Sequence, residues 1–389
     1  MGVPGDERGI LDRASAIAAR VEPRTAEIEH ARTLPADLAR EIARAGLFRL
    51  LVPGELGGLE CAPATMVRAI ETVARADGSA GWCTMIGATT GLIAAFLPEP
   101  AAREIFGDPE TVVGGVFHPR GIARVEDGGY RVRGRWPFAS GCRHCAWLLG
   151  GAIVHQGDAT ALRADGKPEA RMMIFRAHEV EILDTWNVSG LRGTGSHDIA
   201  VADVFVPRER SVWFSTDPAR AKGALYAMPT FGLLASGIAG VALGIAAGAI
   251  ADLAALASVK TPTGGGRPLA ARGAIQTEMA QATAALESAR THLLAVLDEA
   301  FAYAQRGGSF DAAARARIRL AATHATRESA RVVDRMYEAG GGTAIYETSP
   351  LQRRFRDVHV ATQHVMVAPA TWEVLGRILL GLETDTELL

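Results

Sequence analysis

This chain of 389 residues contains few cysteines and few aromatic residues, and its net charge is small. Four cysteines are too few for a disulfide framework. The 41 Lys and Arg residues nearly balance the 43 Asp and Glu residues, which leaves a formal net charge of −2 and none of the basic excess that nucleic-acid binding requires. Aromatic residues make up 6% of the chain, whereas 43 glycines and frequent alanines favour closely packed helices over a large β-sandwich.

A secretory leader and a dinucleotide-binding motif are also missing. The first residues, MGVPGDERGILDRAS, include acidic side chains and no apolar stretch, so we expect a protein of the reducing cytoplasm. No G-x-G-x-x-G sequence follows a strand and opens a helix, which argues against a nicotinamide-binding Rossmann domain. A chain of this length with 48% hydrophobic residues predicts two or three packed layers or subdomains.

One uncharged stretch, residues 231–250 (FGLLASGIAGVALGIAAGAI), is about long enough to cross a membrane. Its apolar character rests mainly on Ala and Gly, and Asp252 follows closely. Four glycines fall at spacings of three and four, on one helix face that a neighbouring helix can approach closely: Gly237, Gly240, Gly244 and Gly248. No second span and no basic flank accompany the stretch. We therefore interpret it as a buried bundle helix rather than a membrane helix.

The character of the sequence changes twice along the chain. Residues 1–110 carry apolar side chains at helical spacing, broken at Asp77-Gly78, where one helix should end and another begin. The pattern of residues 111–213 predicts strands, with a hairpin turn at Asp127-Gly128 and further strands at 146–154, 170–177 and 199–207. Residues 214–389 predict an antiparallel bundle with helices at 231–259, 268–306, 310–339 and 354–381. The expected fold class is α+β, mainly α, with three domains at these boundaries.

Cys142 and Cys145, with His144 between them, have the C-x-x-C spacing of a zinc or redox pair. A structural zinc ion needs four ligands, and the other two cysteines, Cys61 and Cys83, are isolated in the sequence. We expect no metal and interpret the pair as a strand end.

Two other patterns also have plain structural interpretations. Ser196-His197-Asp198 contains the three residue types of a catalytic triad. Adjacent residues on a strand point to opposite faces, so these side chains cannot relay a proton in series. Six arginines in the third bundle helix are interleaved with Ala, Ile and Leu, which predicts a solvated helix face rather than an anion site: Arg315, Arg317, Arg319, Arg327, Arg331 and Arg335.

Two segments of the β-domain carry candidate ligand-binding residues. In residues 191–196 (LRGTGS), glycines and hydroxyls allow backbone N–H groups to approach a flat or anionic ligand, although a simple turn explains them equally well. Trp136, Phe138 and Ser140 place large aromatics beside a hydroxyl at a strand end. Core packing is the plain interpretation there, and a ligand with a broad apolar ring and polar edges is the other.

His359 and His364 lie close together in the last predicted helix. Histidine exchanges a proton near neutral pH, so either residue is a candidate acid or base. A hydrogen-bonded structural role is the alternative for each.

Taken in order, these segments resemble the acyl-CoA dehydrogenase fold over nearly the whole chain. The similarity lies in PGELGG at 53–58, DGSAGW at 77–82, WNVSGLRGTGS at 186–196, DVFVP at 203–207, GRPL at 266–269 ahead of Gln276, YEAGGGT at 337–343 and SPLQRRFRD at 349–357. The resemblance implies an N-terminal helical domain, a middle β-barrel domain and a C-terminal four-helix bundle, assembled as a homotetramer.

The chain departs from the dehydrogenases at the carboxylate base that removes a proton from the substrate. That family keeps a glutamate a few residues after the Arg-Asp segment, where this chain has Val365, Met366 and Val367. Some members take the base from the first bundle helix instead, but no Asp or Glu lies between Lys222 and Asp252. Dehydrogenation would therefore lack its proton acceptor.

What remains is similar to the two-component flavin-dependent monooxygenases of the same fold (group D), the hydroxylases of phenol and aromatic polyketide metabolism such as dihydrokalafungin hydroxylase and 4-hydroxyphenylacetate hydroxylase. The resemblance implies hydroxylation of an aromatic, phenolic or polyketide-type molecule through a flavin C4a-hydroperoxide. It implies reduced FMN as cofactor, with FAD as the alternative, O₂ as co-substrate and a separate NAD(P)H:flavin reductase as partner.

The resemblance also implies roles for individual residues. His364, with His359 as a second candidate, would act as acid or base, and Ser140 would hold the N5 edge of the flavin. Arg267 would neutralise the flavin phosphate across a subunit boundary. The other flavin contacts would come from Trp136, Phe138, Trp186, Arg192, Thr194, Gly195 and Ser196, and the substrate contacts from His118 and Trp82.

Three alternatives stay open at this point. Related enzymes oxidise the nitrogen of amines and amino sugars or the sulfur of thiophenes. A true acyl-CoA dehydrogenase with an unrecognised base and a structural homologue without flavin are the others.

Overall fold

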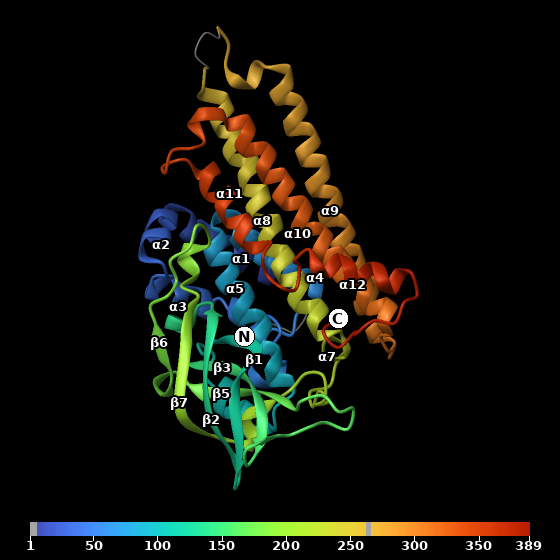
Figure 1. The fold of residues 1–389 in the computed structure, drawn as a ribbon. Coiled ribbons are helices and arrows are strands. Elements are labelled where there is room, and N and C mark those ends of the chain that lie inside the picture. Colours follow the sequence, from blue (N-terminus) through green and yellow to red (C-terminus); the bar gives the residue numbers. More distant parts are fainter. Residues whose placement is uncertain (1–5, 262–265) are drawn as a thin grey trace.

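The computed structural model describes residues 6–261 and 266–389, in which helices, strands and helices follow one another along the chain (Figure 1). The N-terminal part is helical, as its apolar spacing predicts. Its α-helices are α1 (Glu7–Val21), α2 (Thr25–Ala31), α3 (Ala36–Arg44), α4 (Pro63–Ala76), α5 (Gly78–Thr90) and α6 (Glu99–Phe106).

The predicted break at Asp77-Gly78 separates α4 from α5. Asp77 adopts an extended backbone, and its buried carboxylate accepts a hydrogen bond from the Ala80 backbone N–H at 2.9 Å. An aspartate in this position caps the first turn of a helix and fixes where it begins. Gly81 then packs directly on Ala74, so the two helices turn back closely on each other.

The middle of the chain forms one sheet at one end of the helices (Figure 1). The strand order is β6-β7-β2-β1-β3-β5-β8, with β4 paired to β3. The hairpin turn predicted at Asp127-Gly128 joins β1 and β2, and the other predicted strands are confirmed as β3, β5 and β7. The edge strands β6 and β8 do not pair with each other in the described chain, so hydrogen bonds between strands do not close a barrel. The strands are β1 (Val113–Glu126), β2 (Gly129–Ala139), β3 (Trp147–Gln156), β4 (Ala159–Thr160), β5 (Ala170–Arg176), β6 (Glu181–Leu183), β7 (His197–Pro207) and β8 (Ser211–Val212).

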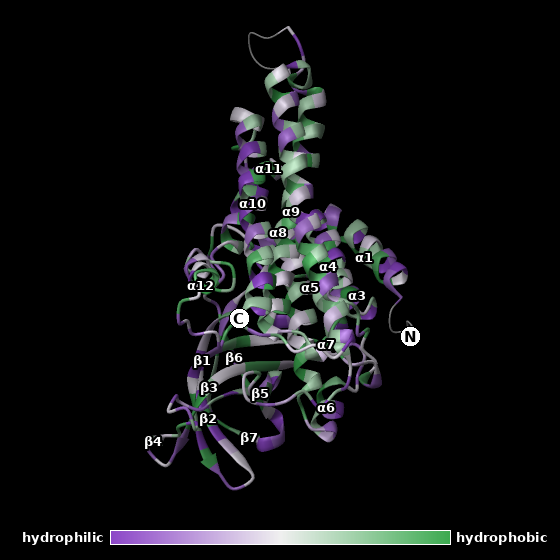
Figure 2. Cartoon of the chain, turned by 90° about the vertical axis from the view of Figure 1, so that its right-hand side faces the viewer, coloured by the Kyte–Doolittle hydropathy of each residue, from purple (hydrophilic) through white to green (hydrophobic). Residues whose placement is uncertain are grey.

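The C-terminal part is helical again and consists of α7 (Ala224–Ala227), α8 (Thr230–Val259), α9 (Gly273–Gln305), α10 (Ala312–Gly340), α11 (Pro350–Ala361) and α12 (Ala370–Leu379). Helix α8 packs against α4 on one side and α10 on the other. The outer ends of α8, α9 and α10 project beyond the rest of the molecule (Figure 2).

Helix α8 is the one described helix long and apolar enough to cross a membrane. In its most apolar window, 83% is buried against the rest of the protein, which confirms the interpretation as a bundle helix. The predicted glycine face makes this burial possible. A Cβ at Gly244 would lie 2.4 Å from the Glu71 carbonyl oxygen on α4, and one at Gly237 would lie 2.8 Å from Met85 on α5.

The last predicted helix, 354–381, is wrong in one respect that matters for the site. It is two helices, α11 and α12, separated by turns at residues 362–369. Pro369 stands at the start of α12 and cannot donate a backbone N–H to a helix running through from α11. His364 therefore lies in an irregular segment between helices and not on a helix face.

Candidate active site

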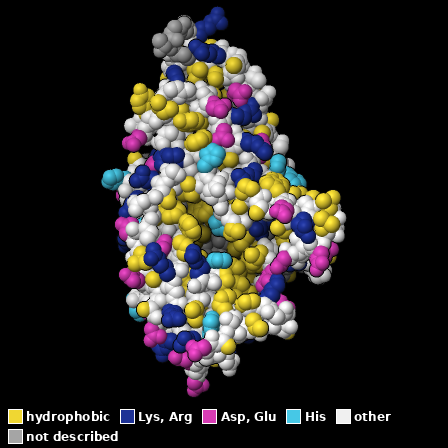
Figure 3. All heavy atoms as spheres, viewed as in Figure 1, with side chains coloured by type: hydrophobic (Ala, Val, Ile, Leu, Met, Phe, Trp, Pro, Cys, Tyr) yellow, Lys and Arg dark blue, Asp and Glu magenta, His cyan; other side chains and the backbone are white. Residues whose placement is uncertain are grey.

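A cavity of about 1070 Å³ lies where the sheet meets the helices. Its walls come from α5, from strands β1, β3 and β5, from α8 and from the segment between α11 and α12. Most of the lining is apolar, including Met85, Ile86, Ile93, Phe117, Trp213 and Leu234. Figure 3 shows a hollow on this side of the molecule, bordered by hydrophobic side chains and histidines. A mostly apolar pocket with a few polar groups is the usual form of a small-molecule site.

Three hydroxyl groups and one indole form a directed chain of hydrogen bonds on the cavity wall. Trp82 Nε1 donates to Ser140 Oγ at 3.0 Å, and Ser140 Oγ lies 2.7 Å from Ser196 Oγ. Ser196 Oγ lies 2.6 Å from Thr194 Oγ1, which donates to the Leu191 carbonyl oxygen at 2.8 Å. When Thr194 donates its proton to that carbonyl, Ser196 must donate to Thr194 and Ser140 to Ser196, because each hydroxyl has one proton. The oxygen of Ser140 is left as an acceptor toward the cavity.

The loop that carries Thr194 and Ser196 is fixed by hydrogen bonds to Asp357 and to the Gly141 backbone. Leu191 has a φ of 49° and Gly195 a φ of 51°, both in the left-handed region, which is unfavourable for a leucine. Asp357 on α11 compensates, since its Oδ1 accepts the Leu191 backbone N–H at 2.6 Å. At the other end, the Gly141 N–H donates to the Thr194 carbonyl at 2.8 Å, which ties the loop to the segment of Ser140.

Asp357 is buried beside a second carboxyl group, that of Asp77. Burial, together with the negative charge of Asp77, raises the pKa of Asp357 to about 7. Burial likewise raises the pKa of Asp77, although its hydrogen bond from Ala80 opposes the shift. The pair therefore links the start of α5, which carries Trp82, to the loop that carries Ser196.

His364 also lines the cavity, next to the Trp82 end of these hydrogen bonds, with its ring centroid 5.8 Å from that of Trp82 and tilted by 58°. Its Nδ1 accepts the backbone N–H of Met366 at 3.2 Å. Burial, and then the nearby positive charge of Arg319, lower the pKa of His364 to about 4. The ring is therefore neutral near pH 7 and carries its proton on Nε2.

Phe138 and Trp186 stand at the edge of the cavity. Their rings meet edge to face at 6.2 Å. Phe138 has a φ of 69° and is 67% exposed, although phenylalanine rarely adopts that backbone or leaves its ring in water. Trp186 is buried, with Nε1 donating to the Leu191 carbonyl at 3.2 Å. His118 on β1 is exposed at the rim and also lines the cavity.

Residues 5–101 match the family described as acyl-CoA dehydrogenase, N-terminal domain, and residues 236–369 match acyl-CoA dehydrogenase, C-terminal domain. An indole-3-acetate monooxygenase of Acinetobacter baumannii is 33% identical over 349 residues, which are 89% of this chain and 87% of that protein. The flavin-dependent monooxygenase oxygenase subunit HsaA of Mycobacterium tuberculosis is 31% identical over 383 residues, covering 94% of this chain and 93% of the relative.

The chain belongs to the flavin-dependent monooxygenases of the acyl-CoA dehydrogenase fold.

Solved structures agree with this assignment. The HsaA monooxygenase from M. tuberculosis superimposes with a TM-score of 0.89 at 29% identity, over 99% of this chain and 100% of that one. XiaF from Streptomyces sp., solved in complex with FADH2 and glycerol, gives a TM-score of 0.87 at 25% identity over 97% and 96% of the two chains. As an oxygenase component, the protein is a flavin-dependent enzyme that works with a separate flavin reductase and a small-molecule substrate.

The charged residues around the cavity separate this monooxygenase from a dehydrogenase. Val365 and Met366 line the cavity where a base would be needed. Within the described ranges, the only side-chain carboxylates in the lining are those of Asp385 and Glu387, and both are held in ion pairs with Lys167 and Arg163. No unpaired side-chain carboxylate of the described residues is therefore available there to remove a proton.

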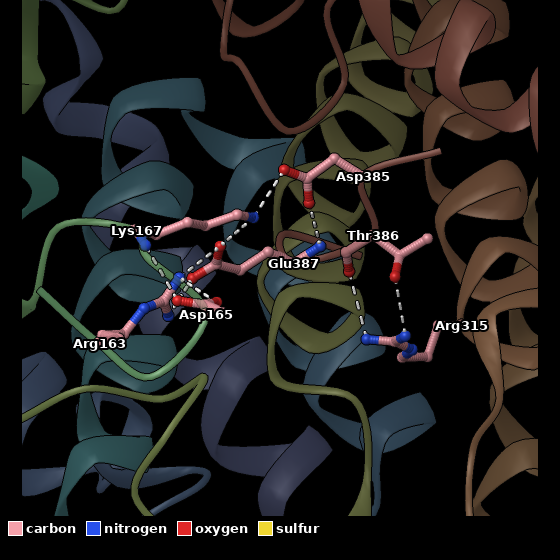
Figure 4. Close-up of polar contacts among 7 residues, drawn as sticks. All are labelled: Arg163, Asp165, Lys167, Arg315, Asp385, Thr386 and Glu387. Atoms are coloured by element: carbon pink, nitrogen blue, oxygen red, sulfur yellow. Dashed lines mark hydrogen bonds and ion pairs between the residues drawn. The ribbon is translucent and has the colours of Figure 1, made fainter. Parts of the chain in front are cut away.

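These ion pairs fasten the C-terminal segment, residues 382–389, over one side of the cavity. Arg163 Nη1 lies 2.8 Å from Glu387 Oε1, and Lys167 Nζ lies 2.9 Å from Asp385 Oδ2. Figure 4 shows these side chains of the β4–β5 loop pointing toward the segment, with Arg315 holding Thr386 from the other side. This closure was not expected from the sequence, because the ion-pair partners are more than 200 residues apart.

Five predicted site residues do not line the cavity, and Trp136 and His359 are two of them. Trp136 is fully buried inside the sheet, where its ring occupies the space left by Gly121, Gly134 and Gly150, and its Nε1 donates to the Gly151 carbonyl. The prediction that it walls the flavin is therefore wrong. The prediction of a catalytic His359 is also wrong, since its ring lies outside the cavity, 42% exposed and paired with Asp334 at 2.7 Å.

The remaining predicted flavin contacts lie behind or away from the cavity. Gly195 is buried under the loop, and a Cβ there would meet the Arg32 carbonyl at 2.8 Å. Arg192 is half-buried outside the lining, with its Nε lacking a hydrogen-bond partner in the described chain. Arg267 is exposed in the segment between α8 and α9 and does not line the cavity of its own chain.

The interpretation of the arginine-rich helix as a solvated face is wrong for Arg319. That side chain is 5% exposed and lines the cavity. A helical-wheel argument could have found it, because the residues at its own helical spacing, Ala316, Thr323 and Thr326, are small and buried. Among the described residues, no group of three or more His, Cys, Asp or Glu side chains is placed to hold a metal ion.

Proposed function

We propose that the enzyme inserts one oxygen atom of O₂ into an aromatic substrate of phenolic or polyketide type. Reduced FMN is the proposed cofactor, with FAD as the alternative, delivered by a separate NAD(P)H-dependent reductase. The observation that carries the proposal is the chain from Trp82 through Ser140, Ser196 and Thr194, which presents a hydrogen-bond acceptor to an apolar cavity.

That acceptor fits a reduced flavin better than an oxidised one. Reduced flavin carries a hydrogen on N5, whereas oxidised flavin carries only a lone pair there. Since the Ser140 proton is committed to Ser196, Ser140 Oγ accepts the N5–H and discriminates against the oxidised form. Phe138 and Trp186 would hold the ring system, and Thr194 and Ser196 would fix its polar edge. When bound, the reduced flavin supplies the two electrons that activate dioxygen.

His364 acts in this proposal as a hydrogen-bond donor. Its Nδ1 is occupied by the Met366 N–H, so the neutral ring offers Nε2–H and cannot take up a second proton without losing that contact. A donor in this position holds the oxygen atom of a phenol, or the oxygen that leaves during transfer, in a low-dielectric pocket. The geometry favours this role over that of a base.

The mostly apolar lining would limit the access of water, on which efficient oxygen transfer depends. Trp82 contributes one wall, and His118 at the rim would contact the substrate as it binds. In a homotetramer, Arg267 from a projecting bundle could reach the flavin phosphate of another subunit, which is the role proposed for it. The cytoplasm, where reduced nicotinamide is available to a reductase, is the proposed compartment.

Sulfur or nitrogen oxidation is the alternative reaction. The dibenzothiophene monooxygenase TdsC and KijD3, the latter solved with FMN and a dTDP-amino sugar, share the fold at 21% and 23% identity. The apolar lining favours an aromatic ring, whether carbon or sulfur is oxidised, over an amino sugar. A dehydrogenase is disfavoured by the paired state of both carboxylates. Reduction of enzyme-bound FAD by an acyl-CoA in the absence of oxygen would support the dehydrogenase alternative.

Turnover with a flavin reductase tests the proposed function. The purified protein, reduced FMN or FADH₂ and a panel of phenols should consume oxygen and give a product heavier by one oxygen atom. Hydrogen peroxide as the sole product for every compound would contradict the proposal.

A further inference from the structure

Arg319 is a buried cation in the wall of the active-site cavity. It lies on α10 and is 5% exposed. Its Nε donates to the Met366 carbonyl at 2.5 Å, and its Nη1 donates to the Leu388 carbonyl at 2.9 Å. Nη2 makes no hydrogen bond to any described residue. The guanidinium therefore keeps donors that the protein itself does not use.

The other charged side chains around the cavity are already paired. Five charged side chains line it, and four of them pair with one another: Arg163, Lys167, Asp385 and Glu387. Within the described parts of the chain, no carboxylate lies within 4.0 Å of the Arg319 guanidinium, whose hydrogen-bond partners are both backbone carbonyls. Burial lowers its pKa to about 10, so it stays protonated at neutral pH. A buried charge without a counterion is unfavourable, and an anionic ligand would relieve this.

We propose that Arg319 binds the carboxylate of an acidic aromatic substrate. This rests on the proposed function and narrows its substrate class to aromatic acids. The planar guanidinium suits a carboxylate, because N–H groups that lie in one plane match its two oxygens. The position beside Met366 places the acid next to His364, which lies two residues earlier on the same segment. Arg319 thus sets the end of the cavity at which the acidic group lies.

A purely structural role makes a different prediction. In that role Arg319 only ties the segments of Met366 and Leu388 to α10. Its removal would then weaken the binding of neutral and anionic ligands alike. Arg315, one turn away on α10, provides the matched control because it also ties the C-terminal segment, through Thr386, but does not line the cavity.

Isothermal titration calorimetry on the full chain separates the two roles. The ligands are 3-hydroxybenzoate, 4-hydroxyphenylacetate and 4-hydroxycinnamate, each compared with its primary amide. We expect at least one acid to bind about tenfold or more tightly than its amide, the range for one desolvated charge-assisted contact. Arg319→Met should bring that ratio close to one and Arg319→Lys should keep part of it. Arg315→Met should leave it unchanged.

Three results would overturn the proposal: a ratio near one for every pair in the unmodified protein, a ratio that survives in Arg319→Met, or an equal loss in Arg315→Met. The first result does not depend on the folding of any variant. Binding is measured without flavin or turnover, so it is independent of the proposed oxygenation. Formation of oxygenated product from neutral phenols would support the proposed function even if the acids bound no better than the amides.

Discussion

The proposed hydrogen bond between Ser140 and the reduced flavin can be tested by removing the Ser140 hydroxyl. It accepts from Trp82 and contacts Ser196, so Ser140→Ala removes the cavity-facing acceptor and breaks the chain at its middle. We expect product formation to fall about 10²-fold, as for loss of one preorganised active-site group, while peroxide release rises. The measurement is the ratio of oxygenated product to hydrogen peroxide per O₂ consumed.

Ser236→Ala is the control for Ser140. Ser236 is equally buried on α8, but its hydroxyl bonds to the Gly232 carbonyl within its own helix. An equal loss of coupling in both variants would show that the chain of hydroxyls has no special role.

The pH dependence of catalysis tests the role of His364. Its pKa is lowered to about 4 by burial and by Arg319, so the ring stays neutral from pH 5.5 to 8. A donor role predicts a kcat without a step near pH 6.5 and partial rescue by His364→Gln, which keeps an N–H donor, but not by His364→Ala. A kcat that falls below pH 6.5 in the native enzyme and loses that step in His364→Gln would identify a base instead.

At the scale of elements, the contact between α11 and the 191–196 loop depends on the protonation of Asp357. Its pKa is raised from 3.8 to about 7, so the folded state retains a proton that the unfolded state releases in this range. The stability contributed by this group therefore decreases as the pH rises from about 4 to 7.

Asp357→Asn should remove this pH dependence, because the amide oxygen still accepts the Leu191 N–H and carries no charge beside Asp77. Urea unfolding should show the variant gaining stability relative to the native protein between pH 5 and pH 8. Asp357→Ala, which loses the acceptor, should be less stable at both values. A difference between Asp357→Asn and the native protein that does not change with pH would contradict the assignment.

The C-terminal segment is a second element whose fastening can be measured. Glu387→Arg places two cations together at Arg163 and should speed amide hydrogen exchange in residues 382–389. The double variant Arg163→Glu/Glu387→Arg should restore most of the protection. If exchange is as slow in the single variant as in the native protein, the ion pairs do not hold the segment, as is common for exposed pairs.

For the whole molecule, the junction between the N-terminal helices and the bundle depends on the glycine face of α8. Gly244→Ala would bring a Cβ to 2.4 Å from the Glu71 carbonyl and 2.6 Å from Ala74, so we expect a destabilisation of about 1–3 kcal/mol and a lower thermal midpoint. Gly273→Ala is the matched control, since nothing lies within 4 Å of its added Cβ. Equal midpoints would contradict close packing at this face.

Much of this architecture could be predicted from the sequence, and the exceptions share physical causes. The glycine face of α8, the break at Asp77-Gly78 and the alternation in β1 and β2 are local patterns, so they predicted their elements. Trp136 was misassigned because the glycines that make room for its ring lie on neighbouring strands. The pairing of Arg163 with Glu387, like the isolation of Arg319, depends on segments that meet only in the folded chain.

The most direct test of the account is a single turnover with ¹⁸O₂. The oxygenase is mixed anaerobically with reduced FMN and a phenol or aromatic acid that it binds, and ¹⁸O₂ is then admitted. We predict a product that contains one ¹⁸O atom, and a lower yield of that product from Ser140→Ala. A product whose new oxygen comes from water, or labelled peroxide with no oxygenated product, would contradict it.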